Sequence, residues 1–99
     1  LIACVGYLPQ DADARNQRIR ELEALALKTG QTQLFIETPY RNAVLQQALL
    51  QTLQHHTRLC IARGLTLAGA SVRSDTVKGW RASNTAADAR LPAVFALGR

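Results

Sequence analysis

Several residue types are missing or scarce in this chain of 99 residues, and each shortage excludes a class of protein. No apolar stretch approaches the roughly 20 residues of a membrane span, and there is no signal peptide pattern. Two cysteines without a secretory signal do not suggest a disulfide framework, so a cytoplasmic setting fits best. Cys4 and Cys60 lie inside apolar runs, which predicts that both are buried free thiols.

Methionine is absent altogether, so we expect that Leu1 is not a natural translation start. The first residues, LIACVGYLP, already have the composition of a strand, and their continuous apolar run predicts that this strand is buried. The length allows one small domain at most. We therefore expect a piece of a larger protein, cut near a domain boundary, with part of any functional site lying on the other piece.

The signature motifs of several enzyme classes are also missing. There is no GxSxG nucleophile elbow, and the six glycines are too dispersed to form a phosphate-binding loop. Cys4 and Cys60 have no CxxC partner, and the adjacent His55 and His56 cannot chelate as an i, i+4 pair would. We therefore expect no metal site.

Positive charge is in excess but scattered. The net charge is +5, from twelve Lys and Arg against seven Asp and Glu, and only two of the cations are Lys. Spread positive charge favours anionic partners, nucleic acid included, but it is equally typical of a solvated surface. Both interpretations stay open on composition alone.

Hydrophobic periodicity predicts strands alternating with helices. The strands are expected at residues 1–7, 32–38, 58–63, 71–75 and 92–98, and the helices at 12–29, 41–54 and 76–82. A polar connection is expected at 85–90. The link between 63 and 71 is too short for a parallel crossover, so those two strands should be antiparallel if adjacent. The prediction is an α/β (α+β) domain with a mixed five-stranded sheet and three to four helices.

The two longer helices should be amphipathic, each with one apolar stripe facing the core. The expected stripes are Ile19, Leu22, Leu25 and Ala26 in the first helix, and Val44, Leu45, Ala48, Leu49 and Leu53 in the second.

The run TQLFIETPYRN, residues 32–42, changes from apolar to polar at its middle. Glu37, Tyr40 and Arg41 surround Pro39 there, and a strand end of this kind is where α/β domains usually bind ligands. A carboxylate at the end of an apolar strand needs a partner, and Arg41 could give it a charge-assisted hydrogen bond. From spacing alone the pair either marks a site or only holds the turn.

Five segments in order resemble the C-terminal domain of the tetrapyrrole (corrin/porphyrin) methylase family of S-adenosylmethionine-dependent methyltransferases. They are CVGYLP (4–9), TQLFIETPYRN (32–42), TRLCIARGLT (57–66), TVKGW (76–80) and LPAVFALG (91–98). The resemblance is to an uncharacterised bacterial branch near the ribosomal RNA ribose methyltransferases. It implies that residues 1–99 are the C-terminal domain of a two-domain enzyme, whose N-terminal domain is absent from this chain.

The resemblance also implies a cofactor, S-adenosylmethionine, bound in the cleft between the two domains. The residues that it assigns to this wall of the cleft are Ile36, Glu37, Cys60, Ile61, Ala62, Pro92 and Ala93. Tyr40 and Arg41 would lie on the substrate side. If the acceptor is a ribose hydroxyl, a base is needed, and Glu37 is the candidate catalytic residue.

The methyl acceptor stays open between a tetrapyrrole-like small molecule and ribosomal RNA. Arg63 and Gly64 stand where the ribosomal RNA branch usually has an acid. We expect a homodimer, no membrane partner, and weak or no cofactor binding by this piece alone. The alternative is a non-catalytic α/β module that binds RNA or a protein partner through its basic surface.

Overall fold

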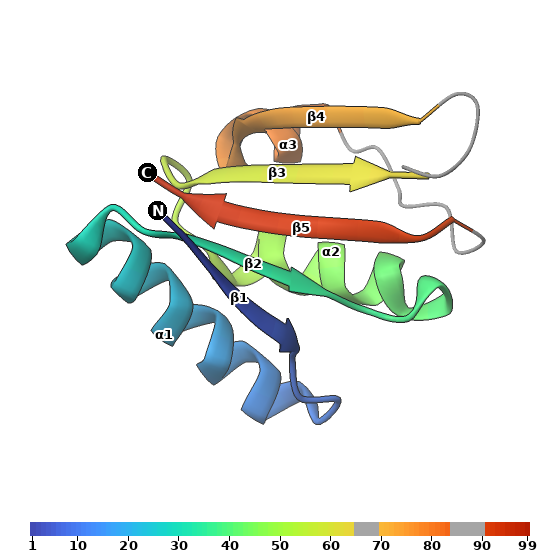
Figure 1. Cartoon of the computed structure of the whole chain (residues 1–99), viewed down its shortest axis with the longest axis horizontal. Coiled ribbons are helices and arrows are strands. Elements are labelled where there is room, and N and C mark those ends of the chain that lie inside the picture. The colour runs from blue at the N-terminus through green and yellow to red at the C-terminus, as the bar shows by residue number, and fades with distance from the viewer. Residues whose placement is uncertain (65–69, 84–90) are drawn as a thin grey trace.

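The structure is a computed structural model that describes residues 1–64, 70–83 and 91–99. The elements in chain order are β1 (Ile2–Tyr7), α1 (Ala12–Thr29), β2 (Thr32–Ile36), a 3₁₀ turn η1 (Pro39–Arg41), α2 (Asn42–Thr52), β3 (Arg58–Arg63), β4 (Ser71–Thr76), α3 (Val77–Ser83) and β5 (Ala93–Gly98). The described strands form one five-stranded sheet in the order β1-β2-β5-β3-β4 (Figure 1).

The sheet is mixed, as predicted. β1 and β2 are parallel and are connected through α1, whereas β5 runs antiparallel to both of its neighbours, β2 and β3. The predicted antiparallel pairing of β3 with β4 is confirmed, with Arg58 opposite Thr76 and Arg63 opposite Ser71. β5, the strand that comes last in the chain, therefore lies in the middle of the sheet.

Helix α1 has the predicted bounds because both of its ends carry strong local signals. The Asp11 carboxylate accepts a hydrogen bond from the Ala14 amide at 2.9 Å, which caps the first turn. Gly30 ends the helix in the left-handed region at φ 75°, a conformation that costs glycine little. No helix among the described residues is both long and apolar enough to cross a membrane.

Other element bounds differ by one or two residues from the prediction. β2 ends at Ile36, two residues early, because the chain turns into η1 at Pro39 and α2 begins only at Asn42. β5 begins at Ala93 because Pro92 has no N–H to give to a ladder. The predicted connection at 85–90 lies outside the described residues.

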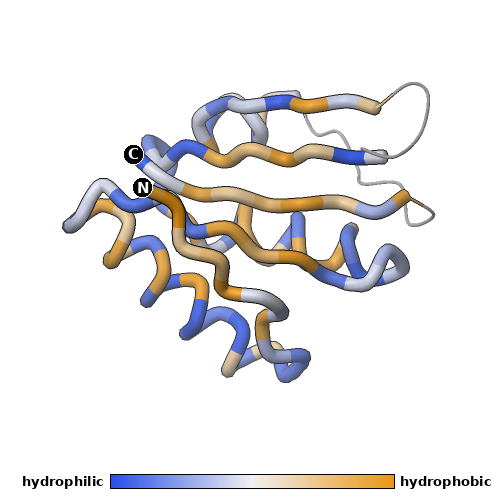
Figure 2. Tube along the Cα trace, in the orientation of Figure 1, coloured by the Kyte–Doolittle hydropathy of each residue, from blue (hydrophilic) through white to orange (hydrophobic). Residues whose placement is uncertain are grey.

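One face of the sheet carries the core. Alternate residues of β2, β3 and β5 point to this face and pack in a single cluster with buried residues of all three helices. The rings of Phe35 and Phe95 are stacked in this cluster, with centroids 5.8 Å apart, and Trp80 of α3 belongs to the same cluster. Figure 2 shows the apolar colour running along β1, β2 and β5 and through the middle of β3, while β4 is mostly polar and the helices alternate between apolar and polar residues.

The other face of the sheet, called the open face below, receives none of the residues of this core cluster. Its side chains lie in rows across the strands. One row is Ile36, Val94, Ala62 and Val72, and the next is Cys4, Leu34, Ala96, Cys60 and Ser74. Most of these residues are half-buried, and Val72 is 64% exposed. The open face is therefore largely apolar.

Five burial predictions were wrong. Cys4 is exposed and Cys60 half-buried, because both point to the open face. β1 was expected to be a buried strand, but it lies at the edge of the sheet with Ile2 and Tyr7 exposed. Leu25 and Val44 lie at the margins of their helix stripes and are 43% and 51% exposed.

Candidate functional site

Three of the predicted site segments meet at one end of the sheet, which we call the site end. β2 and β3 finish there and β5 begins there, because β5 is antiparallel to both. Val94 lies between Ile36 on one side and Ala62 on the other in the same register. The sequence had separated these residues by 26 or more positions, and the topology brings them into one row.

The side chains of the predicted cofactor residues divide between the two faces. Ile36 and Ala62 point to the open face, whereas Ile61 and Ala93 are 2% and 5% exposed and belong to the core. β3 is paired on both sides, so the backbone of Ile61 is engaged in ladders. Only the open-face side chains and the backbone at the strand ends can therefore contact a ligand.

Glu37 is 8% exposed and follows the last residue of β2. Its Oε1 accepts a hydrogen bond from the Thr38 amide at 2.8 Å. Within the described part of the chain it forms no ion pair with Arg41, the partner that the sequence had suggested. The carboxylate thus holds its own turn through Oε1. A carboxylate has a second oxygen, so a role as a base would not require this bond to break.

The exposed Tyr40 and the half-buried Arg41 form a pair on the turn η1. The guanidinium carbon of Arg41 lies 5.1 Å from the centroid of the Tyr40 ring, a cation–π distance, and Tyr40 is 66% exposed. Pro39 at the start of η1 fixes the backbone angle that begins this turn. The turn therefore presents an aromatic face and a positive charge to solvent beside the site end.

Hydrogen bonds from three elements tie the site end together. The Asn42 amide nitrogen donates to the Leu91 carbonyl at 2.9 Å, and the Gly64 amide donates to the Pro92 carbonyl at 2.9 Å. Arg63 donates to the Gln46 side chain at 2.6 Å. Asn42, Gly64 and Leu91 were not predicted as site residues, and no local spacing links them, since 49 positions separate Asn42 from Leu91.

Cys60 lies away from the site end. It lines a shallow hollow of about 170 Å³ on the open face, together with Thr32, Arg58, Ser74 and Ala96. This hollow is toward the opposite end of the sheet, where β2 and β3 begin and β5 finishes. Cys60 and Ala62 therefore face the same side of the sheet at different positions along β3, and only Ala62 is near the site end.

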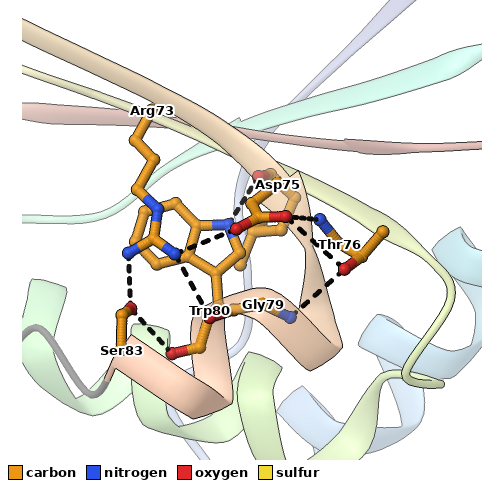
Figure 3. Close-up of polar contacts among 7 residues, drawn as sticks. Arg73, Asp75, Thr76, Gly79, Trp80 and Ser83 are labelled. Atoms are coloured by element: carbon orange, nitrogen blue, oxygen red, sulfur yellow. Dashed lines mark hydrogen bonds and ion pairs between the residues drawn. The ribbon is translucent and has the colours of Figure 1, made fainter.

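The TVKGW segment forms a corner between β4 and α3, which Figure 3 shows in detail. The Arg73 guanidinium lies 4.0 Å from the Trp80 ring centroid and donates to Asp75 at 3.1 Å and to the Gly79 carbonyl at 3.2 Å (Figure 3). The Trp80 indole donates to the Leu59 carbonyl of β3 at 2.7 Å. The hydrogen bond and ion pair from Arg73 lower the pKa of Asp75. These polar contacts hold α3 against the edge of the sheet formed by β3 and β4.

Several arginines are engaged with the protein itself. Arg81 donates to the carbonyls of Leu50 and Leu53 at the end of α2. Arg99 donates to those of Leu27 and Lys28 at the end of α1. Cations at helix C-termini satisfy carbonyls that the helix leaves open and offset the negative end of its dipole. Part of the excess positive charge therefore has a structural use.

The described residues contain no group of three His, Cys, Asp or Glu side chains that could hold a metal ion. Comparison with known protein families gives no match, and no curated protein matches the sequence.

Comparison with solved structures shows that the chain shares its fold with a methyltransferase. The solved structure is that of the methyltransferase CobJ, with a TM-score of 0.59. The match covers 99% of this chain and 41% of the CobJ chain at 11% sequence identity. The likeness establishes the fold, and this chain spans less than half the length of the protein that it matches.

Proposed function

We propose that this chain is one domain of an S-adenosylmethionine-dependent methyltransferase and supplies one wall of its cofactor cleft. The observation that carries the proposal is the meeting of Ile36, Ala62 and Pro92 at the site end, in a domain with the fold of a methyltransferase. Small and apolar side chains at strand ends let a ligand approach the backbone closely. The sulfonium cofactor supplies the methyl group in this chemistry.

The open face supports a two-domain arrangement. A sheet with helices on one side and apolar rows on the other needs a cover in water. We propose that the N-terminal domain of the same polypeptide packs here and completes the cleft at the site end. A second copy of the chain is the competing occupant, which sedimentation of the full-length protein distinguishes.

On the acceptor side, the exposed Tyr40 ring and the Arg41 guanidinium suit a planar and anionic molecule. A tetrapyrrole-like small molecule with carboxylates and ribosomal RNA both have this chemistry. Transfer to carbon or nitrogen needs mainly orientation, whereas transfer to a ribose hydroxyl needs a base, for which we propose Glu37.

Calorimetry of the full-length protein with S-adenosylhomocysteine tests the cofactor wall. We expect binding by the wild type, and a loss of at least tenfold in affinity for Ala62→Glu, which places a carboxylate in the proposed wall. Ala24→Glu is the matched control, since Ala24 is an exposed residue of α1. Equal affinity for the two variants would remove this wall from the cofactor site.

The same titration distinguishes a methyltransferase from a non-catalytic binding module. If the wild type does not bind S-adenosylhomocysteine, the methyltransferase proposal fails and the RNA-binding or protein-binding module remains. If it binds, transfer of labelled methyl groups to separate pools of RNA and carboxylated tetrapyrroles identifies the acceptor. Glu37→Gln should then abolish turnover of a ribose acceptor while cofactor binding survives.

A further inference from the structure

Asn42 has surroundings that a stabilising core residue would not have. Its side chain is fully buried at the start of α2. The Leu91 carbonyl can only accept, so the amide nitrogen must face it and the orientation of the amide is fixed. The Asn42 Oδ1 is then buried with no hydrogen-bond partner in the described part of the chain. Burying an oxygen without a hydrogen bond costs free energy, and an apolar side chain of similar size would avoid this cost.

The bond to Leu91 therefore accounts for the presence of an amide here. Leu91 and Pro92 immediately precede β5, and their two carbonyls are held from different elements. Asn42 of α2 binds the first, and Gly64 at the end of β3 binds the second. Gly64 takes the left-handed conformation, φ 62°, in which it makes this bond. Together the two bonds clamp the start of β5.

We infer that Asn42 is a positioning residue, which fixes Pro92 and Ala93 relative to the turn that carries Glu37, Tyr40 and Arg41. Asn42 directly follows η1, so its side chain links that turn to the start of β5. The clamp is a property of this chain alone. What the clamp is used for, holding the cofactor wall in register, rests on the proposed function.

The test compares two buried amides. Gln33 is 1% exposed, and its Nε2 donates to the Gln31 carbonyl at 2.9 Å, near the start of β2 and away from the site end. Asn42→Asp and Gln33→Glu each replace a donating amide with a carboxylate facing a main-chain carbonyl. Asn42→Ala, which adds no charge, covers the case in which Asn42→Asp does not fold.

The first measurement is amide hydrogen exchange in the full-length protein. In either Asn42 variant the Gly64 amide should exchange at least tenfold faster relative to the average of β3 and β5, because its acceptor on Pro92 is no longer held. In Gln33→Glu this ratio should stay within twofold of the wild type. A rise that is the same for all amides would overturn the positioning role.

The second measurement is the dissociation constant for S-adenosylhomocysteine, at a temperature where all variants are folded. The Asn42 variants should bind at least tenfold more weakly than Gln33→Glu. Equal affinity together with a selective rise at Gly64 would overturn the functional use of the clamp. If the wild type itself does not bind, the proposed function fails, while the exchange ratio still decides whether Asn42 positions β5.

Discussion

The corner between β4 and α3 and the site end are both tied by polar side chains, but in opposite ways. At the corner, Arg73 has partners on every side: a ring, a carboxylate, a hydroxyl and a main-chain carbonyl (Figure 3). At the site end, the buried Asn42 Oδ1 has no hydrogen-bond partner among the described residues, and the Tyr40 ring lies in solvent. Regions that depart from complete satisfaction are where functional sites are expected.

The difference suggests that the two regions respond differently to mutation. Changes at the corner should lower the free energy of unfolding, because its polar groups bind one another and enclose the buried Trp80 ring. Changes on the exposed side of the site end should alter binding with little effect on unfolding. The predictions below test that contrast, beginning with the largest expected loss of stability.

Trp80→Ala should be the most damaging change. The side chain is 1% exposed, and its removal leaves a cavity and deletes the hydrogen bond from the indole to the Leu59 carbonyl. Truncation of a buried tryptophan costs about 3–5 kcal/mol, enough to unfold a domain of modest stability. Urea unfolding measures the loss. Trp80→Phe, which keeps most of the volume but not the N–H, should cost about 1–3 kcal/mol; a larger loss than for Trp80→Ala would contradict this account.

Gly79→Ala should destabilise the protein although alanine is the better helix former. A Cβ at this position would overlap the Asp75 carboxylate, which is held by Arg73 and by the Thr76 amide. We expect a net loss of about 1 kcal/mol, since broken charge-assisted bonds outweigh the helix propensity gained.

As a control, the effect of Gly79→Ala on stability should change sign when the Asp75 carboxylate is removed. In an Asp75→Ala background the overlap is gone, so Gly79→Ala should now stabilise by about 0.5–1 kcal/mol. Urea midpoints of the four proteins complete the cycle. The same sign in both backgrounds would show that the carboxylate is not what requires glycine.

Asp75 should make a contribution to stability that depends on pH. The hydrogen bond from Arg73 lowers the folded-state pKa of Asp75 below 3.8. A lowered folded pKa means that this stability is present above the unfolded-state pKa and is lost as the pH falls through the folded one. The difference in the free energy of unfolding between the wild type and Asp75→Asn should therefore be constant at neutral pH and shrink below about pH 4. Acid titration of unfolding checks this, and a difference that grows toward low pH would exclude it.

Tyr40→Ala should have the smallest effect on unfolding, within about 0.5 kcal/mol, because the side chain is 66% exposed. Under the proposed function it should nonetheless weaken acceptor binding by the full-length protein. Thermal unfolding and acceptor KM, measured on the same preparation, separate the two effects. Phenylalanine at this position should restore binding if the ring face is what is used.

Much of the fold was predictable because local signals agree with it. Asp11 and Gly30 fixed α1, and the alternation around Phe35 identified a strand with one buried face. The position of β5 between β2 and β3 was not predictable, because strand order depends on long-range pairing. For the same reason the sequence located Cys60 within a strand but not on the open face.

The assignment of these residues to a site stays a prediction. The run around Pro39 forms the turn η1 after β2. The topology brings Ile36, Ala62 and Pro92 to one end of the sheet, whereas Cys60 lies away from it. The sequence suggested Arg41 as the partner of Glu37, whereas the structure shows a hydrogen bond from the Thr38 amide to the carboxylate. The adjacent amide is closer along the chain than the guanidinium. Asn42 escaped notice since a helix-start asparagine is common, and only its contact with Leu91 distinguishes it.

The central position of β5 has a consequence for how the molecule is assembled. β1 and β2 form one half of the sheet, and β3 and β4 form the other. Among the described strands, the two halves are joined only through β5. The five-stranded sheet therefore cannot be completed until residues 93–98 have been synthesised. Until then, β2 and β3 each have one unpaired edge, to which β5 later forms hydrogen bonds. Emergence of β5 from the ribosome should be the step that commits the domain to its native state.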